Sequence, residues 1–98
     1  MAPATKLWVD DLRAAPAGWT WAKDYDMATA HLSMGKVVSL SLDHDLGEGQ
    51  KTGYDIAKWM VETKIYPPYI FVHSLNSVGA ANIRQLLEHY APSHVKVF

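Results

Sequence analysis

The chain contains no cysteine. This absence excludes disulfide bonds, thiolate nucleophiles and cysteine-ligated zinc sites, and it fits a cytoplasmic protein. The sequence also lacks a charge bias, because 9 basic residues nearly balance 10 acidic ones and no basic run is present. We therefore expect no binding of long duplex nucleic acid, whereas a small nucleotide needs only a few local charges.

No stretch of the sequence has the roughly 20 consecutive apolar residues that a membrane-spanning helix needs. The first residues, MAPATKLWVDD, also lack the basic and apolar regions of a secretory signal peptide. We therefore expect no association with a membrane. A length of 98 residues with 49% hydrophobic composition predicts one folded domain over residues 1–98, with a modest core.

Short apolar runs alternate with amphipathic segments along the chain. Strands are predicted at residues 6–9, 19–22, 37–42, 69–72 and 95–98, and helices at about 24–34, 53–63 and 78–90. This alternation indicates an α/β fold with a mostly parallel sheet of four or five strands and crossover helices. The segment between the first two strands is short for a parallel crossover. We therefore expect the first helix to be missing or reduced and the second strand to be irregular or antiparallel.

Polar residues follow three of the predicted strands. They are Asp10 and Asp11 after the first strand, Asp43, His44 and Asp45 after the run VVSLSL, and His73 and Ser74 after the run YIFV. Since ligands of open parallel sheets bind at the carboxyl ends of the strands, we expect these side chains to meet at one rim. Clustered carboxylates repel one another unless a cation or a shared proton intervenes. Mg²⁺ prefers oxygen ligands, and added imidazoles favour Mn²⁺ or Zn²⁺. Two histidines also allow acid–base chemistry without a metal.

Each of these residues also has an ordinary structural explanation. Asp11 and Asp45 could cap turns, and His73 could be a core histidine. Ser74 and Asn76 could cap the helix that follows them. The four tryptophans are expected in the core rather than as stacking platforms for bases.

Three segments of the chain, LWVDDLR, SLDHDLG…TGYDIAKW and VHSLNSVGAANI, together resemble the cyclic-phosphate-processing receiver-like domains. These domains are relatives of the receiver domains of response regulators. The resemblance extends from about residue 6 to residue 87 and implies a compact, flavodoxin-like three-layer sandwich. It matches Asp10 and Asp11 to the acidic pair of a receiver, Asp43 to its phospho-acceptor and Ser74 to its hydroxyl. The lysine after the fifth strand of a receiver has no match, and the two histidines are additions to the receiver pattern.

The family is inferred to act on cyclic phosphates, either of RNA ends or of nucleotide signals. The resemblance therefore implies a phosphoesterase that opens a cyclic phosphate in a nucleotide. In this hypothesis Asp10, Asp11 and Asp43 bind a divalent cation, Mg²⁺ or Mn²⁺, and His44 and His73 act as base and acid. A covalent phosphoryl intermediate on Asp43 ranks lower. The residues expected to contact the substrate are Arg13, Asp45, Ser74, Asn76, Gly79 and Asn82.

Two other functions would use the same residues. A binding module could capture a cyclic nucleotide without cleaving it, as a sponge. A receiver-like interaction domain could switch a partner through phosphorylation of Asp43, although the missing lysine argues against this. Short edge strands and exposed aromatic residues permit a homodimer.

Overall fold

The computed structural model describes residues 4–98, which form five strands and three helices. The strands are β1 (Thr5–Val9), β2 (Thr20–Ala22), β3 (Val37–Leu42), β4 (Tyr69–Val72) and β5 (Lys96–Val97). The helices are α1 (Tyr25–Ser33), α2 (Gly53–Thr63) and α3 (Ser77–Tyr90). All the predicted elements are present, and their ends differ from the prediction by at most one residue. Within the described range, no helix combines the length and the apolar character that crossing a membrane requires.

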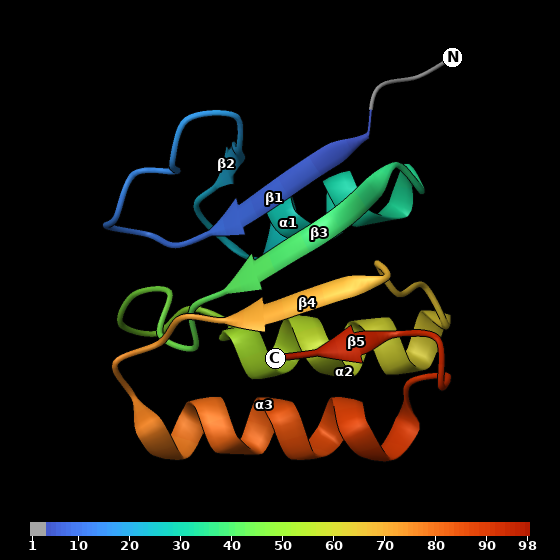
Figure 1. Cartoon of the computed structure of the whole chain (residues 1–98). Helices are drawn as coiled ribbons and strands as arrows, with labels where there is room; N and C mark the ends of the chain where they lie inside the picture. The colour runs from blue at the N-terminus through green and yellow to red at the C-terminus, as the bar shows by residue number, and fades with distance from the viewer. Residues whose placement is uncertain (1–3) are drawn as a thin grey trace.

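The strands form one parallel sheet in the order β2-β1-β3-β4-β5 (Figure 1). The predicted receiver-like α/β fold is therefore confirmed, and the segment 10–19 contains no helix. The prediction for β2 was wrong, because this strand pairs in parallel with β1 and places Trp21 opposite Trp8. Indole N–H groups secure the short connection. Trp8 Nε1 donates to the Arg13 carbonyl at 2.9 Å, and Trp21 Nε1 donates to the Asp10 carbonyl at 2.7 Å.

The three helices cover only one face of the sheet. Alternate strand residues point to this face and are buried, among them Leu7, Val9, Leu40, Leu42 and Ile70. They form one core with buried residues from all three helices, and no helix lies in front of the strands in Figure 1. The third layer of the predicted sandwich is thus absent from residues 4–98. A right-handed crossover from β1 to β2 would place its helix on the opposite face, and the segment 10–19 forms none.

Helix α2 begins directly against the end of β3. Thr52 is its N-cap, and the Thr52 side chain and the Asp55 carboxylate each accept a hydrogen bond from the other residue's backbone N–H. A Cβ atom on Gly53 would overlap the carbonyl oxygen of Asp43. Only glycine therefore lets α2 begin this close to the loop that carries Asp43 and His44.

Substitution of Gly53 tests this close approach. We expect Gly53→Ala to lower the free energy of unfolding by roughly 1–3 kcal/mol, the usual cost of forcing an extra carbon into a packed site. Urea unfolding followed by circular dichroism measures the change. Lys58→Ala, at an exposed position of the same helix, is the control and should change stability by less than about 0.5 kcal/mol. A Gly53→Ala protein as stable as the wild type would show that α2 tolerates a start further from Asp43.

Candidate functional site

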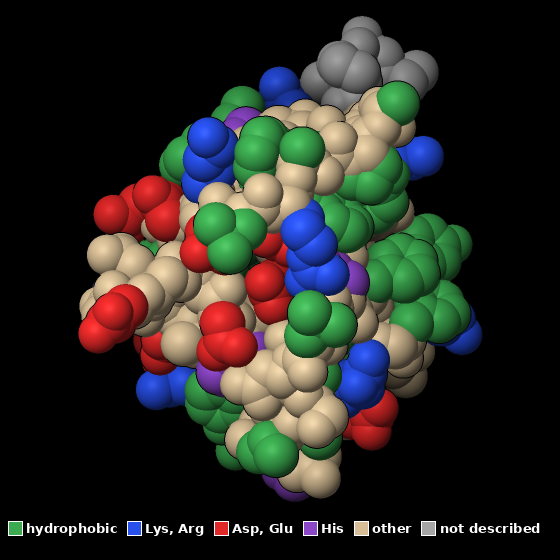
Figure 2. Space-filling view, turned by 90° about the vertical axis from the view of Figure 1, so that its left-hand side faces the viewer, with side chains coloured by type: hydrophobic (Ala, Val, Ile, Leu, Met, Phe, Trp, Pro, Cys, Tyr) green, Lys and Arg blue, Asp and Glu red, His purple; other side chains and the backbone are tan. Residues whose placement is uncertain are grey.

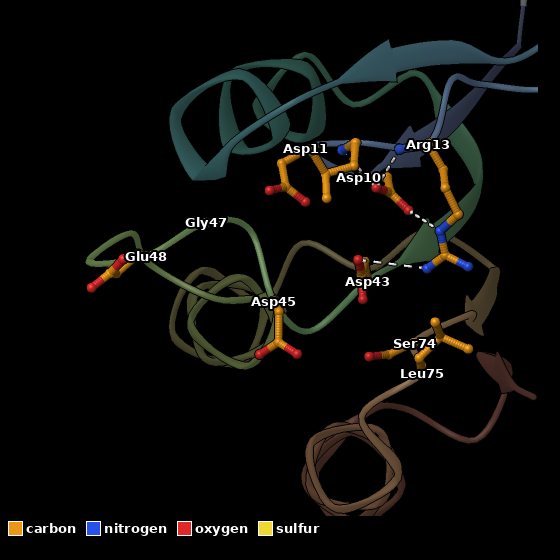
Figure 3. Close-up of a pocket in the computed structure, with 10 residues that line it drawn as sticks. Asp10, Asp11, Arg13, Asp43, Asp45, Gly47, Glu48, Ser74 and Leu75 are labelled. Carbon is orange, nitrogen blue, oxygen red and sulfur yellow. Dashed lines mark hydrogen bonds and ion pairs between the residues drawn. The ribbon is translucent and has the colours of Figure 1, made fainter.

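The carboxyl ends of β1, β3 and β4 lie at one rim of the sheet, where a cleft of about 590 Å³ opens. We call it the acidic cleft. It is lined by Asp10, Asp11, Leu12, Arg13, Asp43, Asp45, Gly47, Glu48, Ser74 and Leu75 (Figure 3). Figure 2 faces this rim and shows Asp and Glu side chains gathered there, with Lys or Arg side chains among them. The structure thus brings together six of the residues selected from the sequence, from segments that follow three different strands.

Asp10 is the most buried carboxylate of the acidic cleft, with 1% of its surface exposed. Its Oδ1 accepts from the backbone N–H groups of Leu12 and Arg13 at 2.9 and 2.8 Å. Its Oδ2 accepts from Arg13 Nε at 2.9 Å and lies 3.1 Å from His73 Nε2. Burial by itself raises the pKa of Asp10, but these hydrogen bonds and the Arg13 charge outweigh burial and hold the pKa below its ordinary value. Asp10 is therefore ionised at neutral pH.

Arg13 places a positive charge among the carboxylates. Its Nη2 lies 3.6 Å from Asp43 Oδ2 and donates to the His73 carbonyl at 3.2 Å, while its Nε binds Asp10. Figure 3 shows the guanidinium between the two aspartates. The side chain is 46% exposed, so part of its hydrogen-bonding capacity remains open to a ligand.

Asp10, Asp11 and Asp43 form a cluster that could hold a metal ion. One carboxylate oxygen from each lies within 4.8 Å of the others. Oxygen-only donors of this kind suit a hard divalent cation. Each oxygen of Asp10 already accepts two hydrogen bonds, whereas the Asp11 carboxylate accepts none from residues 4–98 and Asp43 has only its long contact with Arg13. Asp11 and Asp43 are therefore best placed to bind a cation directly.

His73 lies beside the acidic cleft and does not line it. Its ring stacks on Trp8, with 3.8 Å between the ring centroids and 6° between the planes. Its Nδ1 lies 2.6 Å from Ser41 Oγ, and its Nε2 faces Asp10. Since an ionised carboxylate only accepts hydrogen bonds, Nε2 carries the proton of the neutral ring and Nδ1 accepts from the Ser41 hydroxyl. Both ring nitrogens are engaged, so this geometry favours a positioning role over the acid–base role predicted for His73.

His44 and Asp45 form a hydrogen-bonded pair between two clefts. His44 Nδ1 lies 2.9 Å from Asp45 Oδ1. The Asp45 carboxylate lines the acidic cleft, whereas the His44 ring lines a second cleft of about 670 Å³. The hydrogen bond from His44 lowers the pKa of Asp45 against a smaller opposing effect of burial, and Asn76 lowers it further. Asp45, with its lowered pKa, is therefore the member of this pair that lines the acidic cleft.

The start of α3 fixes the position of this pair. Asn76 caps the helix, because its Oδ1 accepts from the Gly79 N–H at 2.9 Å, and its Nδ2 lies 3.3–3.4 Å from the Asp45 carboxylate. Ser74 Oγ accepts from the Asn76 N–H at 3.0 Å. A Cβ on Gly79 would overlap the His44 ring. Gly79 therefore makes room for His44, and its engaged amide argues against the phosphate contact predicted for it.

Asn82 lies apart from the acidic cleft. It lines the second cleft together with His44, Thr52, Tyr54, Gln85, Leu86, His89 and Tyr90. Five residues that touch the acidic site were not selected from the sequence: Ser41, Gly47, Glu48, Leu12 and Leu75. Glu48 lies between two glycines in the loop that also carries Asp43 and Asp45, and it could have been selected as a further carboxylate of that loop. The two leucines are ordinary loop residues in the sequence, and nothing in it indicates that they flank the cleft.

The burial of His73 predicts a loss of stability in acid. Burial lowers the pKa of His73, the Arg13 charge adds to this, and the hydrogen bond and charge of Asp10 oppose it only in part. Because the pKa values of both groups are lowered, the unfolded chain binds protons more readily than the folded one. The His73 contribution is present above about pH 6.5 and is lost as the pH falls through its lowered pKa, and that of Asp10 is lost at lower pH.

Urea unfolding at about pH 7.5 and about pH 5.5 measures this dependence. His73→Gln keeps an N–H for Asp10 but cannot titrate, so the difference between the two pH values should shrink. His94→Gln, at an exposed position before β5, is the control and should keep the wild-type difference. A His73→Gln protein with the full wild-type difference would contradict the assignment.

The comparison with known proteins agrees with this arrangement. The model of the family described as cyclic-phosphate processing receiver domain matches residues 5–89, a range that includes every residue lining the acidic cleft. No curated protein and no solved structure matches the chain significantly. The family match spans most of the 98 residues, and the chain belongs to the family of cyclic-phosphate processing receiver domains.

Proposed function

We propose that this chain hydrolyses a cyclic phosphate in a nucleotide, with the phosphate bound in the acidic cleft. The observation that carries the proposal is the placement of Asp11 and Asp43 beside the Arg13 guanidinium, which offers oxygen ligands for a cation next to donors for a phosphate. Membership in the family supports the substrate class. Mg²⁺ or Mn²⁺, when bound, would neutralise and polarise the phosphate.

Arg13 and Ser74 are the residues placed to orient the phosphate. Asp10 and the His73 carbonyl hold the guanidinium through Nε and Nη2, and its Nη1 has no partner among residues 4–98. A guanidinium fixed in this way can bind phosphate oxygens without first losing side-chain freedom. The Ser74 hydroxyl lines the same cleft from the end of β4.

Asp45 and His44 form the proton-transfer group that the geometry supports best. When water opens a cyclic phosphate, a new P–O bond forms, one ester P–O bond breaks, and the proton lost by water is finally taken by the leaving oxygen. Asp45 lines the cleft, so its carboxylate can accept that proton after a change of rotamer, and the His44 imidazole and the Asn76 amide hold the carboxylate between them. His73 acts through Asp10 and Arg13 as a positioning residue.

A second candidate function is capture of the cyclic nucleotide without cleavage. It is favoured by the observation that neither histidine ring lines the acidic cleft and that both ring nitrogens of His73 are engaged. The same cation and guanidinium would then hold an intact ligand. One experiment separates the two functions.

The pure protein is incubated with 2′,3′-cyclic monophosphates, 3′,5′-cyclic mononucleotides and cyclic di- and trinucleotides, in Mg²⁺, Mn²⁺ or EDTA, and the nucleotides are separated by chromatography. We expect a linear product that EDTA prevents. Asp43→Asn should lower kcat/KM by more than about 100-fold, since even residues that only support a metal ligand contribute roughly 10–100-fold. Asp26→Asn, at an exposed position of α1, is the control and should leave kcat/KM unchanged.

Heat denaturation before a second chromatography run completes the experiment. A compound that disappears from solution and returns intact after heating would establish capture and contradict hydrolysis. If every compound stays free and unchanged, both candidate functions are contradicted, and labelling of Asp43 by acetyl phosphate becomes the next measurement.

Gly79→Ala tests the Asp45–His44 pair without removing either member. The added Cβ must displace the His44 ring, so we expect turnover to fall by about 100-fold, the lower range of a general acid–base contribution. Glu88→Ala, at an exposed position of the same helix, should keep full turnover. Circular dichroism checks that both variants fold. Full turnover in folded Gly79→Ala and His44→Ala proteins would remove the pair from the mechanism.

A further inference from the structure

The face of the sheet opposite the helices carries exposed aromatic rings. Tyr69 and Phe71 on β4 and Phe98 after β5 point to it, and their residues are 48%, 36% and 56% exposed. The rings of Phe71 and Phe98 stack, with 4.8 Å between centroids and 11° between planes. Strand register places Lys6 and Lys96 in the same transverse row as Tyr69, with Ser39 between Lys6 and Tyr69. We call the three aromatic residues and the two lysines the aromatic face.

The aromatic face is broad and open. It is turned toward the viewer in Figure 1, and hydrophobic side chains gather on the corresponding right-hand side of Figure 2. The tryptophans of β1 and β2 lie on its other half, but they are only partly exposed and their indole N–H groups are bound to the segment 10–19. Tyr69, Phe71 and Phe98 are therefore the rings available to a partner.

The charges on this face favour an anionic partner. Lys6 and Lys96 are exposed, and none of the five strands in the described residues contains an Asp or a Glu. A second copy of the chain packed face to face would place like charges on both sides of the contact. A polyanion with its own aromatic groups meets both the charges and the rings.

We infer that the aromatic face binds single-stranded nucleic acid. Bases would stack on Tyr69, Phe71 and Phe98, and the two lysines would bind phosphates. Exposed rings on a sheet with basic side chains beside them are the two components of single-strand binding. A duplex keeps its bases stacked inside and offers no base face to these rings, and 9 basic residues against 10 acidic ones give no excess positive charge for a duplex backbone.

The aromatic face is continuous with the acidic cleft through His73. This ring stacks on Trp8 and binds Ser41 on the sheet, and it reaches Asp10 in the cleft. His73 thus joins the two surfaces, and only the idea that a strand on the face would place its end in the cleft rests on the proposed function. Binding to the face itself goes beyond that function and does not depend on it.

Fluorescence anisotropy with labelled oligouridylate and oligothymidylate tests the inference, and the probes carry no cyclic phosphate, so that turnover plays no part. We expect binding that weakens with salt and is tighter than to the matching duplex. Phe71→Leu keeps most of the apolar area but removes the ring, and it should weaken binding about five-fold or more. Lys96→Ala should reduce the slope of log affinity against log salt by about 0.7. Tyr90→Ala is the matched control, because Tyr90 is an exposed aromatic residue on α3, away from this face, and also 56% exposed.

Several outcomes would overturn the inference. They are the absence of binding to both probes, equal affinity for the duplex, unchanged affinity in Phe71→Leu, and an equal loss in Tyr90→Ala, which would locate binding in the second cleft. Sedimentation velocity provides one further outcome that would overturn the inference. A wild-type dimer that becomes monomeric in Phe71→Ala, with no binding of either probe, would assign the face to a second copy of the chain. Hydrolysis of a cyclic mononucleotide without strand binding would overturn only this inference, and strand binding without hydrolysis would overturn only the proposed enzymatic activity.

Discussion

The carboxylate of Asp10 is the group on which the rest of the site depends. A buried charge is tolerated only when it is paired and hydrogen-bonded, and the two oxygens of Asp10 together face four donors from Leu12, Arg13 and His73. Through these bonds Asp10, at the end of β1, fixes the start of the segment 10–19, which lies where a crossover helix would otherwise be. It also fixes the guanidinium of Arg13 and the ring of His73, which follows β4. His73 carries the connection to β3 through Ser41. Asp10 therefore organises the acidic cleft, and the neighbouring Asp11 and Asp43 keep their oxygens available.

The absence of a helix between β1 and β2 shapes both the acidic cleft and the aromatic face. Because the segment 10–19 runs across the rim, Asp11 and Arg13 lie on a loop that the sheet supports from below. The same absence leaves one face of the sheet without a helical cover. Trp8 and Trp21 partly fill that face and use their indole N–H groups to tie the loop down. The missing helix between β1 and β2 thus leaves both a cleft at the rim of the sheet and an exposed aromatic surface beside it.

The sequence allowed the strands, the helices and the residues of the rim to be predicted, because strand ends and helix caps are local features. The positions of the imidazoles depend on contacts between distant segments, and local pattern does not contain them. Side chains alternate between the two faces of a strand, so the His73 side chain points to the same open face as those of Tyr69 and Phe71. There it contacts Ser41 of the neighbouring strand β3. His44 is placed by the missing Cβ of Gly79 in α3. The uncovered face follows from the handedness of the crossovers. Predicting it requires the order of the strands in the sheet as well as the positions of the elements in the sequence.

The placement of the positive charges distinguishes this cleft from a phospho-accepting receiver. Lys96, on β5, pairs in register with Tyr69 at the first residue of β4, so it lies at the far end of the strand from the rim. In this chain the positively charged side chain near Asp43 is instead Arg13, which follows β1. An arginine held by Asp10 is a planar fork rather than a mobile point charge, and such a fork matches two oxygens of a phosphate that arrives as part of a ligand. Asp11 and Asp43 lie in the same cleft as this guanidinium and could hold a divalent cation, and a bound cation would add to the positive surroundings that a phosphate needs.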